Sequence, residues 1–147
     1  MVRNKSNKGT KKNKHQRKNQ KVEQVLIQKA IDYHALGDLS KAEKTYREAI
    51  HCGASDVALF SNLGVICQET QRTYEAIAHY AKALEINPNH PNTYANLGAL
   101  YKALGNFDQA RTSTLKSLEL NPDNPTAHMN LGAIYKDLGG LDRALAC

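Results

Sequence analysis

The sequence predicts an all-α protein: an α-solenoid of antiparallel helix-turn-helix repeats, three complete and one truncated, with a disordered basic N-terminal tail. The triplet Asn-Leu-Gly at residues 62–64 returns at 96–98 and at 130–132, a period of 34 residues. A strict period of this length indicates stacked repeats, each burying its apolar face against its neighbour. The same period relates two further sets of residues, which are Ala42, Ala76, Ala110 and Ala144, and Pro88 and Pro122.

Residues 1–22 form the predicted tail. Residues 1–21 contain nine Lys or Arg, no acidic residue and almost nothing that a core would bury. Because ordering such a segment has no hydrophobic offset, we expect it to be disordered. Clustered cations attract polyanions weakly and without specificity, although the tail has no aromatic residue to stack on bases. The cations in question are Lys11, Lys12, Lys14, Arg17 and Lys18.

Each repeat is predicted to hold two helices. In the third repeat, Tyr94, Leu97 and Tyr101 share one helical face, Gly105 ends the helix in a left-handed conformation, and Asn106 caps the next helix. Pairing of the two helices requires small residues where their backbones approach. We expect Ala30, Gly64, Gly98 and Gly132 on the first helices to face Ala42, Ala76, Ala110 and Ala144 on the second. The repeats are residues 23–56, 57–90, 91–124 and, incomplete, 125–147.

The turns between the two helices of a repeat differ in their residues. Gly37 and Gly139 predict the same glycine stop in the first and fourth repeats. Gln71 occupies this place in the second repeat and is followed by Arg72, a poor N-cap, so we expect this turn to be the least stable.

The ends of the repeats carry prolines. Pro88 and Pro122 predict the ends of the second helices, because proline lacks the donor that a continuing helix needs. Asn124 and Pro125 predict an N-cap followed by proline at the first helical position. His90 opens the third repeat in the same way, with a weaker cap.

The pattern of Leu-Gly, then Tyr, Gly and Ala, and a terminal Asn-Pro in a 34-residue frame resembles the tetratricopeptide repeat. The resemblance covers residues 23–147 and is strongest in 57–147; Lys29 and Ala30 replace Leu-Gly in the first repeat, which is therefore a degenerate repeat or a cap. The segments at 114–122 and 130–139 are similar to long arrays of bacteria, cyanobacterial ones in particular.

The resemblance implies a non-enzymatic scaffold whose first helices line a concave groove for a peptide or protein. Asn62, Asn96 and Asn130 would form a ladder of carboxamides able to pair with an extended peptide backbone, or each would only bond a neighbouring helix. Some family members clamp a carboxylate with Lys and Arg, but the matching positions here lack these cations, so we reject that mode. The groove candidates are Gln28, Ser61, Asn62, Gln68, Asn92, Asn96, Lys102, Asn130 and Lys136.

No motif in the sequence predicts catalysis, a cofactor or a metal. It contains no phosphate-binding loop, no His-Glu-x-x-His and no nucleophile elbow. Cys52, Cys67 and Cys147 lack metal-ligand spacing, and we expect Cys67 to pack between helices as a small apolar side chain. His51 adjoins Cys52, but no third group orients the pair as a catalytic thiol would require.

Two expectations concern the setting of the chain. No apolar stretch is long enough to span a bilayer and no secretory signal is present, so we expect a cytoplasmic protein. The fourth repeat stops within its second helix, which predicts either a fragment of a longer protein or self-association through the uncapped C-terminal end. Two alternatives remain: the N-terminal targeting arm of a larger glycosyl- or sulfotransferase, and nucleic-acid binding led by the tail.

Overall fold

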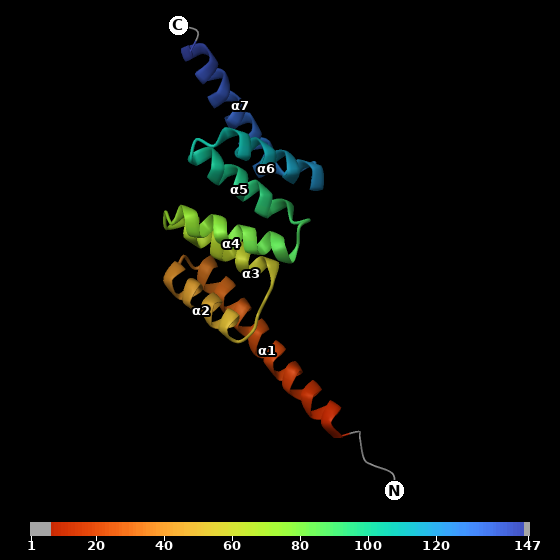
Figure 1. The fold of residues 1–147 in the computed structure, drawn as a ribbon. Coiled ribbons are helices and arrows are strands. Elements are labelled where there is room, and N and C mark those ends of the chain that lie inside the picture. Colours follow the sequence, from red (N-terminus) through yellow and green to blue (C-terminus); the bar gives the residue numbers. More distant parts are fainter. Residues whose placement is uncertain (1–6, 146–147) are drawn as a thin grey trace. The chain divides into compact units, whose positions relative to one another are not determined.

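The computed structural model describes residues 7–145 and, within them, the side chains of residues 19–139. Every regular element in this range is an α-helix, which confirms the predicted class (Figure 1). The chain divides into two compact parts, Met1–Ser55 and Asp56–Cys147. The helices are α1 (Asn7–Ala35), α2 (Leu39–His51), α3 (Val57–Glu69), α4 (Thr73–Ile86), α5 (Pro91–Ala103), α6 (Phe107–Leu120) and α7 (Pro125–Leu145).

The N-terminal part is the helical hairpin of α1 and α2. Ala30 on α1 and Ala42 on α2 are both fully buried, as expected for two helices in close contact. Gly37 adopts a φ of +76° in the turn, which confirms the predicted glycine stop. The carboxylate of Asp38 then caps α2 by accepting from the backbone N–H of Lys41 at 3.1 Å.

The start of α1 at Asn7 differs from the expected disorder of the tail. Residues 7–22 are helical, whereas residues 1–6 lie outside the described residues. Lys, Arg and Gln are good helix formers, and the part of α1 that packs on α2 supplies a nucleus to which further turns add easily. The tail cations Lys11, Lys12, Lys14, Arg17 and Lys18 lie on this extension, where the structure does not describe side chains.

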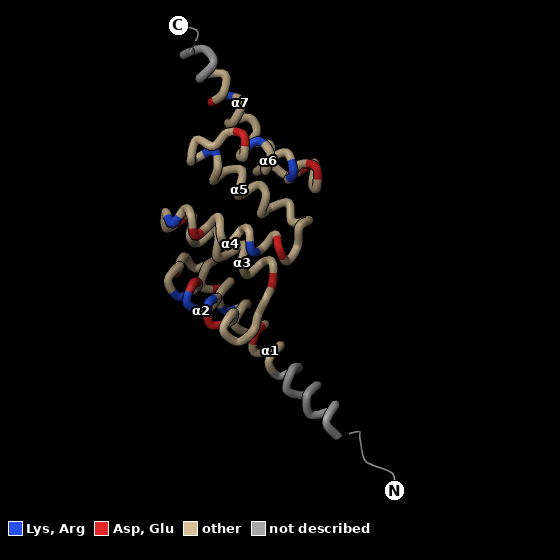
Figure 2. The backbone as a smooth tube through the Cα atoms, viewed as in Figure 1, with Lys and Arg blue, Asp and Glu red and all other residues tan. Residues whose placement is uncertain are grey.

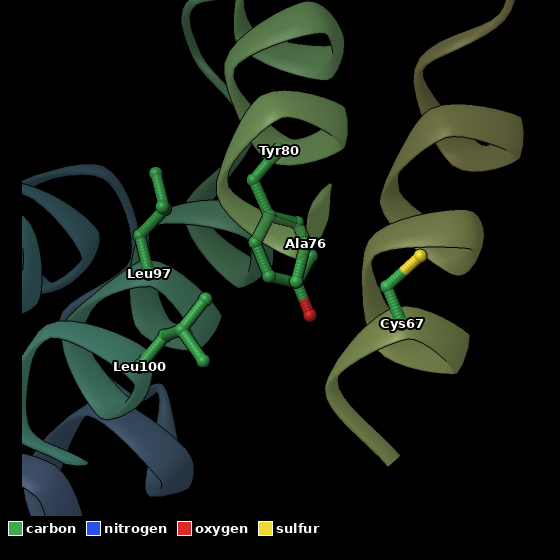
Figure 3. Close-up of a cluster of buried hydrophobic side chains, with 5 residues drawn as sticks. All are labelled: Cys67, Ala76, Tyr80, Leu97 and Leu100. Carbon is green, nitrogen blue, oxygen red and sulfur yellow. The ribbon is translucent and has the colours of Figure 1, made fainter. Parts of the chain in front are cut away.

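The C-terminal part consists of the hairpins α3–α4 and α5–α6, with α7 packed on both α5 and α6. One core cluster joins the hairpins through Cys67, Ala76, Tyr80, Leu97 and Leu100. Figure 3 shows the ring of Tyr80 between Cys67 on α3 and the two leucines on α5. Cys67 is fully buried in this cluster, so its predicted role as a small apolar side chain is confirmed.

The helices of the second and third repeats approach so closely that only glycine fits. A Cβ atom on Gly64 would collide with the ring of Tyr80, and one on Gly98 would collide with Oγ1 of Thr114. The carbonyl oxygen of Ala110 lies 3.3 Å from the same Cβ position on Gly98, which confirms the predicted pairing of these two residues. Tyr80 and Thr114 occupy one position of the 34-residue frame, so the space opposite the glycine is filled by a different side chain in each of the two repeats.

The fourth repeat departs from the prediction. α7 runs through Gly139 without a turn, so the predicted stop is wrong, and so is the pairing of Gly132 with Ala144, since both lie on one helix. Apart from the adjacent backbone of α7, no atom of the described residues lies within 4 Å of a Cβ built on Gly132. A separate second helix would be stable only if it packed along the first. The residues between Gly139 and Leu145 make fewer than two helical turns, which is too short for such packing. Continuing α7 instead keeps the backbone hydrogen bonds of these residues.

The helix ends of the C-terminal part follow the prolines and caps in most places. α4 ends at Ile86 and α6 ends at Leu120, in each case just before the predicted proline. Asn106 is the N-cap residue of α6, but its side chain makes no capping hydrogen bond, so that part of the prediction is wrong. The turn is exposed, and water competes there for the first amide N–H groups of the helix.

The turn of the second repeat has the backbone conformation from which the sequence predicts low stability. Gln71 is the one non-glycine residue with positive φ among the described residues, at 60°. Arg72 stands at the N-cap of α4 without a side-chain capping bond. A left-handed conformation costs a residue with a Cβ about 1 kcal/mol, and glycine avoids this cost.

We therefore expect Gln71→Gly to raise the free energy of unfolding by about 0.5 to 1 kcal/mol. Gly105 holds the same turn position in the third repeat at φ +76°, with open space around it, so Gly105→Gln should lower stability by a similar amount. Urea unfolding followed by circular dichroism at 222 nm measures both. Opposite signs support the backbone argument, and a destabilised Gln71→Gly variant contradicts it.

Within the described residues, none of the helices combines the length and the apolar character that crossing a membrane requires.

Candidate functional site

A pocket of about 510 Å³ opens between α3, α5 and the turn from α6 to α7. Its lining contains several carboxamides and hydroxyls and no Asp, Glu, Lys or Arg, and we call it the amide pocket. The lining residues are Ala58, Ser61, Asn62, Val65, His90, Asn92, Ala95, Asn96, Asn121, Asn124, Pro125 and Thr126.

Helical spacing directs the polar side chains of α3 and α5 into this pocket. Asn92 and Asn96 are four residues apart on α5 and therefore lie on one face, and Asn62 is the residue of α3 that corresponds to Asn96 in the repeat frame. Asn62 and Asn96 are half-buried and Asn92 is exposed, so all three retain contact with solvent. Four of the predicted groove residues thus meet in one place: Ser61, Asn62, Asn92 and Asn96.

The floor of the pocket is organised by the buried side chain of Asn124. Its Oδ1 accepts from the backbone N–H of Ala127 at 3.2 Å, which confirms Asn124 as the N-cap of α7. Its Nδ2 donates to Oδ1 of Asn92 at 3.2 Å and to Oγ of Ser117 at 3.1 Å. The side chain of Asn124 therefore connects α5, α6 and α7. It also fixes the orientation of the Asn92 side chain, and Nδ2 of Asn92 is left to donate to another group.

Other predicted groove residues lie outside the amide pocket. Asn130 donates to the backbone carbonyl of Ala95 at 2.9 Å, so it bonds a neighbouring helix, the second of the two roles expected for the ladder. Lys102 lies 3.8 Å from Asp137, in an ion pair between α5 and α7. Lys136 is exposed on α7.

Two predicted glutamines also have internal partners. Gln68 accepts a hydrogen bond from the hydroxyl of Tyr80 at 3.0 Å. Gln28 belongs to the N-terminal part, where it donates to Asp32 at 3.0 Å. Burial raises the pKa of the Tyr80 phenol well above its usual range, although a hydrogen bond with Asn96 acts in the opposite direction. Tyr80 therefore remains protonated at physiological pH and continues to donate to Gln68.

Sequence reasoning missed the polar residues that reach the pocket from the turns and from the start of α7, which are His90, Asn121, Asn124 and Thr126. It also missed Thr93, a fully buried residue beneath the pocket. One signal was present: Thr93 stands where the second and fourth repeats have the fully buried Leu59 and Ala127, so a hydroxyl occupies a position that is apolar in those repeats.

The uncharged character of the pocket follows from the helices that form it. α3 carries one charged residue, Glu69, and α5 carries one, Lys102, each near the C-terminal end of its helix. Figure 2 shows long stretches of α5 without Lys, Arg, Asp or Glu. In the described residues, no group of three or more His, Cys, Asp or Glu side chains could hold a metal ion.

A second, more open pocket of about 740 Å³ lies in the N-terminal part, between Leu26 of α1 and the polar side of α2. Its lining mixes both signs of charge, and Arg47 pairs with Glu43 at 2.7 Å along the helix. His51 and Cys52 also line it. None of the predicted groove residues lies there, so we take the amide pocket as the candidate site.

Two tetratricopeptide repeat models match the sequence, one over residues 56–123 and one over residues 114–146. Together they cover more than half of the chain, which belongs to the tetratricopeptide repeat family. The matched region contains every residue that lines the amide pocket. No curated protein matched the sequence.

Solved structures of tetratricopeptide domains have the same fold. The Arabidopsis OM64 TPR domain is 22% identical, with a TM-score of 0.77, and the match covers 81% of this chain and 98% of that one. The first TPR of Spaghetti (RPAP3), bound to the HSP90 peptide SRMEEVD, is 23% identical with a TM-score of 0.76, over 81% and 94% of the two chains. The Sgt2 TPR domain of Aspergillus fumigatus is 15% identical with a TM-score of 0.75, over 82% of each chain.

Proposed function

We propose that this protein is a non-enzymatic interaction module that binds an extended, uncharged peptide segment in the amide pocket. The observation that carries the proposal is the convergence of Asn62, Asn92, Asn96 and Asn121 in one uncharged pocket. Each carboxamide offers a donor and an acceptor, the same pair of groups that a peptide unit presents. The pocket volume of about 510 Å³ also falls in the range of ligand sites.

The chemistry of the pocket distinguishes its ligand from a charged peptide tail. A carboxylate requires opposed cations for strong binding, and the described lining residues include no Lys or Arg. The Spaghetti (RPAP3) domain was solved with a peptide that ends in acidic residues, SRMEEVD. We expect this chain to bind that peptide poorly, because burying its carboxylates in an uncharged pocket costs hydration without providing a counter-charge.

A selection from a random peptide library on the whole chain tests the proposal. We expect enriched peptides without charge in the bound segment, and about tenfold weaker binding to the double variant Asn62→Ala, Asn92→Ala, since each neutral hydrogen bond contributes about 0.5 to 1.5 kcal/mol. Fluorescence anisotropy measures the affinities. Unchanged affinity in the double variant, or tighter binding of SRMEEVD than of the selected peptides, would refute the proposal.

Asn89→Ala provides the matched control. Asn89 is an exposed asparagine in the turn before α5 and lies outside the pocket lining. Its replacement should leave the affinity unchanged. Melting curves of all variants separate a loss of binding from a loss of folding.

A further inference from the structure

A chain of two hydrogen bonds leads from one residue of the amide pocket through a buried residue to another residue of the same pocket. The hydroxyl of Ser61 lies 3.1 Å from the hydroxyl of Thr93, and that hydroxyl lies 2.7 Å from Nδ1 of His90. Ser61 and His90 both line the pocket, whereas Thr93 is fully buried beneath it. The side chains come from α3, α5 and the turn between α4 and α5.

The middle member of this chain has a single proton to donate. A threonine hydroxyl donates one hydrogen bond and accepts others. If Thr93 donates to His90, it must accept from Ser61; if it accepts from His90, it is free to donate to Ser61. The presence or absence of a proton on Nδ1 of His90 therefore decides the direction of the hydrogen bond to Thr93 and, through it, of the hydrogen bond to Ser61.

We propose that the chain from His90 through Thr93 to Ser61 is a pH-sensitive relay that sets which peptide group the amide pocket accepts at Ser61. When His90 is neutral with its proton on Nε2, Nδ1 accepts from Thr93, Ser61 donates to Thr93, and the Ser61 oxygen presents a lone pair to a ligand N–H. When His90 is protonated, Nδ1 donates to Thr93, Thr93 donates to Ser61, and the Ser61 O–H points to a ligand carbonyl. The inference rests on the proposed binding role of the pocket.

His90 is the one titratable side chain among the described residues that line the pocket. Histidine is the side chain whose charge ordinarily changes between about pH 5 and 8. No Asp, Glu, Lys or Arg lines the pocket from α3, α5 or the α6–α7 turn. The titratable groups next along these elements are Asp56 at the start of α3, Asp123 in the α6–α7 turn, and His128, whose Nε2 lies 2.7 Å from the carbonyl oxygen of Pro122.

Binding of a small acceptor-only probe tests the relay. N,N-dimethylacetamide has a carbonyl and no N–H, so the protein should bind it at least threefold more tightly at pH 5.5 than at pH 7.5. Nuclear magnetic resonance shifts of the backbone amides at Ser61 and Asn62 measure the affinity. Equal affinity at the two pH values, including the absence of binding at both, would overturn the relay.

Thr93→Val separates the relay from a direct effect of the His90 charge. Valine keeps the shape of threonine and removes the hydroxyl, so the affinity should become equal at the two pH values. A pH dependence that persists in this variant would show that His90 acts on the probe without Thr93, and the relay would be wrong. Asp56, Asp123 and His128 are present in both proteins, so their contributions cancel in the comparison.

Two further measurements complete the test. Ser61→Ala should remove the pH dependence in the same way, whereas His128→Gln should preserve it. The ¹⁵N shifts of the His90 ring report whether Nδ1 carries the proton in the neutral form; a proton on Nδ1 at pH 7.5 contradicts the relay. Because the probe is not a peptide, the two proposals can fail separately. The relay can be absent while peptides still bind, and peptide binding can be absent while the probe still shows the pH dependence.

Discussion

Replacing Gly98 by leucine should lower the free energy of unfolding by about 3 kcal/mol, the upper end of the usual cost of overpacking a core. Even the first added carbon of the side chain would collide with Oγ1 of Thr114 and approach the carbonyl oxygen of Ala110 to 3.3 Å. The carbonyl belongs to the backbone of α6, so relief requires a shift of the whole helix. Urea unfolding of the variant and the parent measures the difference.

Gly132→Leu is the matched control, because Gly132 holds the same position of the repeat frame one period later. Beyond the adjacent helix backbone, no atom that the structure describes lies within 4 Å of its Cβ position, and the residue is solvent-exposed in the middle of α7. The higher helix propensity of leucine should leave stability unchanged or raise it by about 0.5 to 1 kcal/mol. Equal losses in the two variants would show that close approach to α6 is not what requires a glycine at residue 98.

Asn124→Ala should lower the free energy of unfolding by about 2 to 3 kcal/mol. Loss of the cap on α7 accounts for about 1 kcal/mol. The rest arises because the fully buried hydroxyl of Ser117 loses its donor, and an unsatisfied buried polar group costs about 1 to 3 kcal/mol. Thermal unfolding by differential scanning calorimetry measures the change.

Asn106→Ala gives the comparison for this prediction. Asn106 is also an N-cap asparagine, but it is exposed and its side chain makes no capping bond, so its loss should cost less than 0.5 kcal/mol. Asn124→Asp should fall between the two, since a carboxylate keeps the acceptor for Ala127 and loses the donor to Ser117 and Asn92. A loss for Asn124→Ala no greater than that for Asn106→Ala would contradict the account.

The repeat frame predicted local features that depend on a few neighbouring residues. The glycine turns at Gly37 and Gly105, the left-handed residue Gln71 at the matching turn and the proline ends of α4 and α6 all agree with the structure. Each of these depends on the backbone conformation that one residue type permits, and the sequence states that residue type directly.

Predictions of contacts between residues far apart in the sequence were confirmed in some repeats and wrong in others. Gly98 and Ala110 face each other as expected, whereas Gly132 and Ala144 do not, because α7 continues as one helix. Each of the three asparagines of the ladder is followed by Leu-Gly, yet Asn62 and Asn96 line the pocket while Asn130 donates to the backbone of Ala95. These positions are equivalent in the repeat frame, but different residues pack around each of them.

The sequence by itself determined the family, the helical hairpins and the concentration of asparagine on the first helices, because periodicity and turn residues act over a few positions. Only the tertiary structure decided which side chains share the amide pocket and that Ser61, Thr93 and His90 form one hydrogen-bonded chain. Ser61 and Thr93 are 32 residues apart and meet because α3 and α5 pack together. A hydroxyl or carboxamide acquires its role from the partner that folding places beside it, and no local pattern specifies that partner.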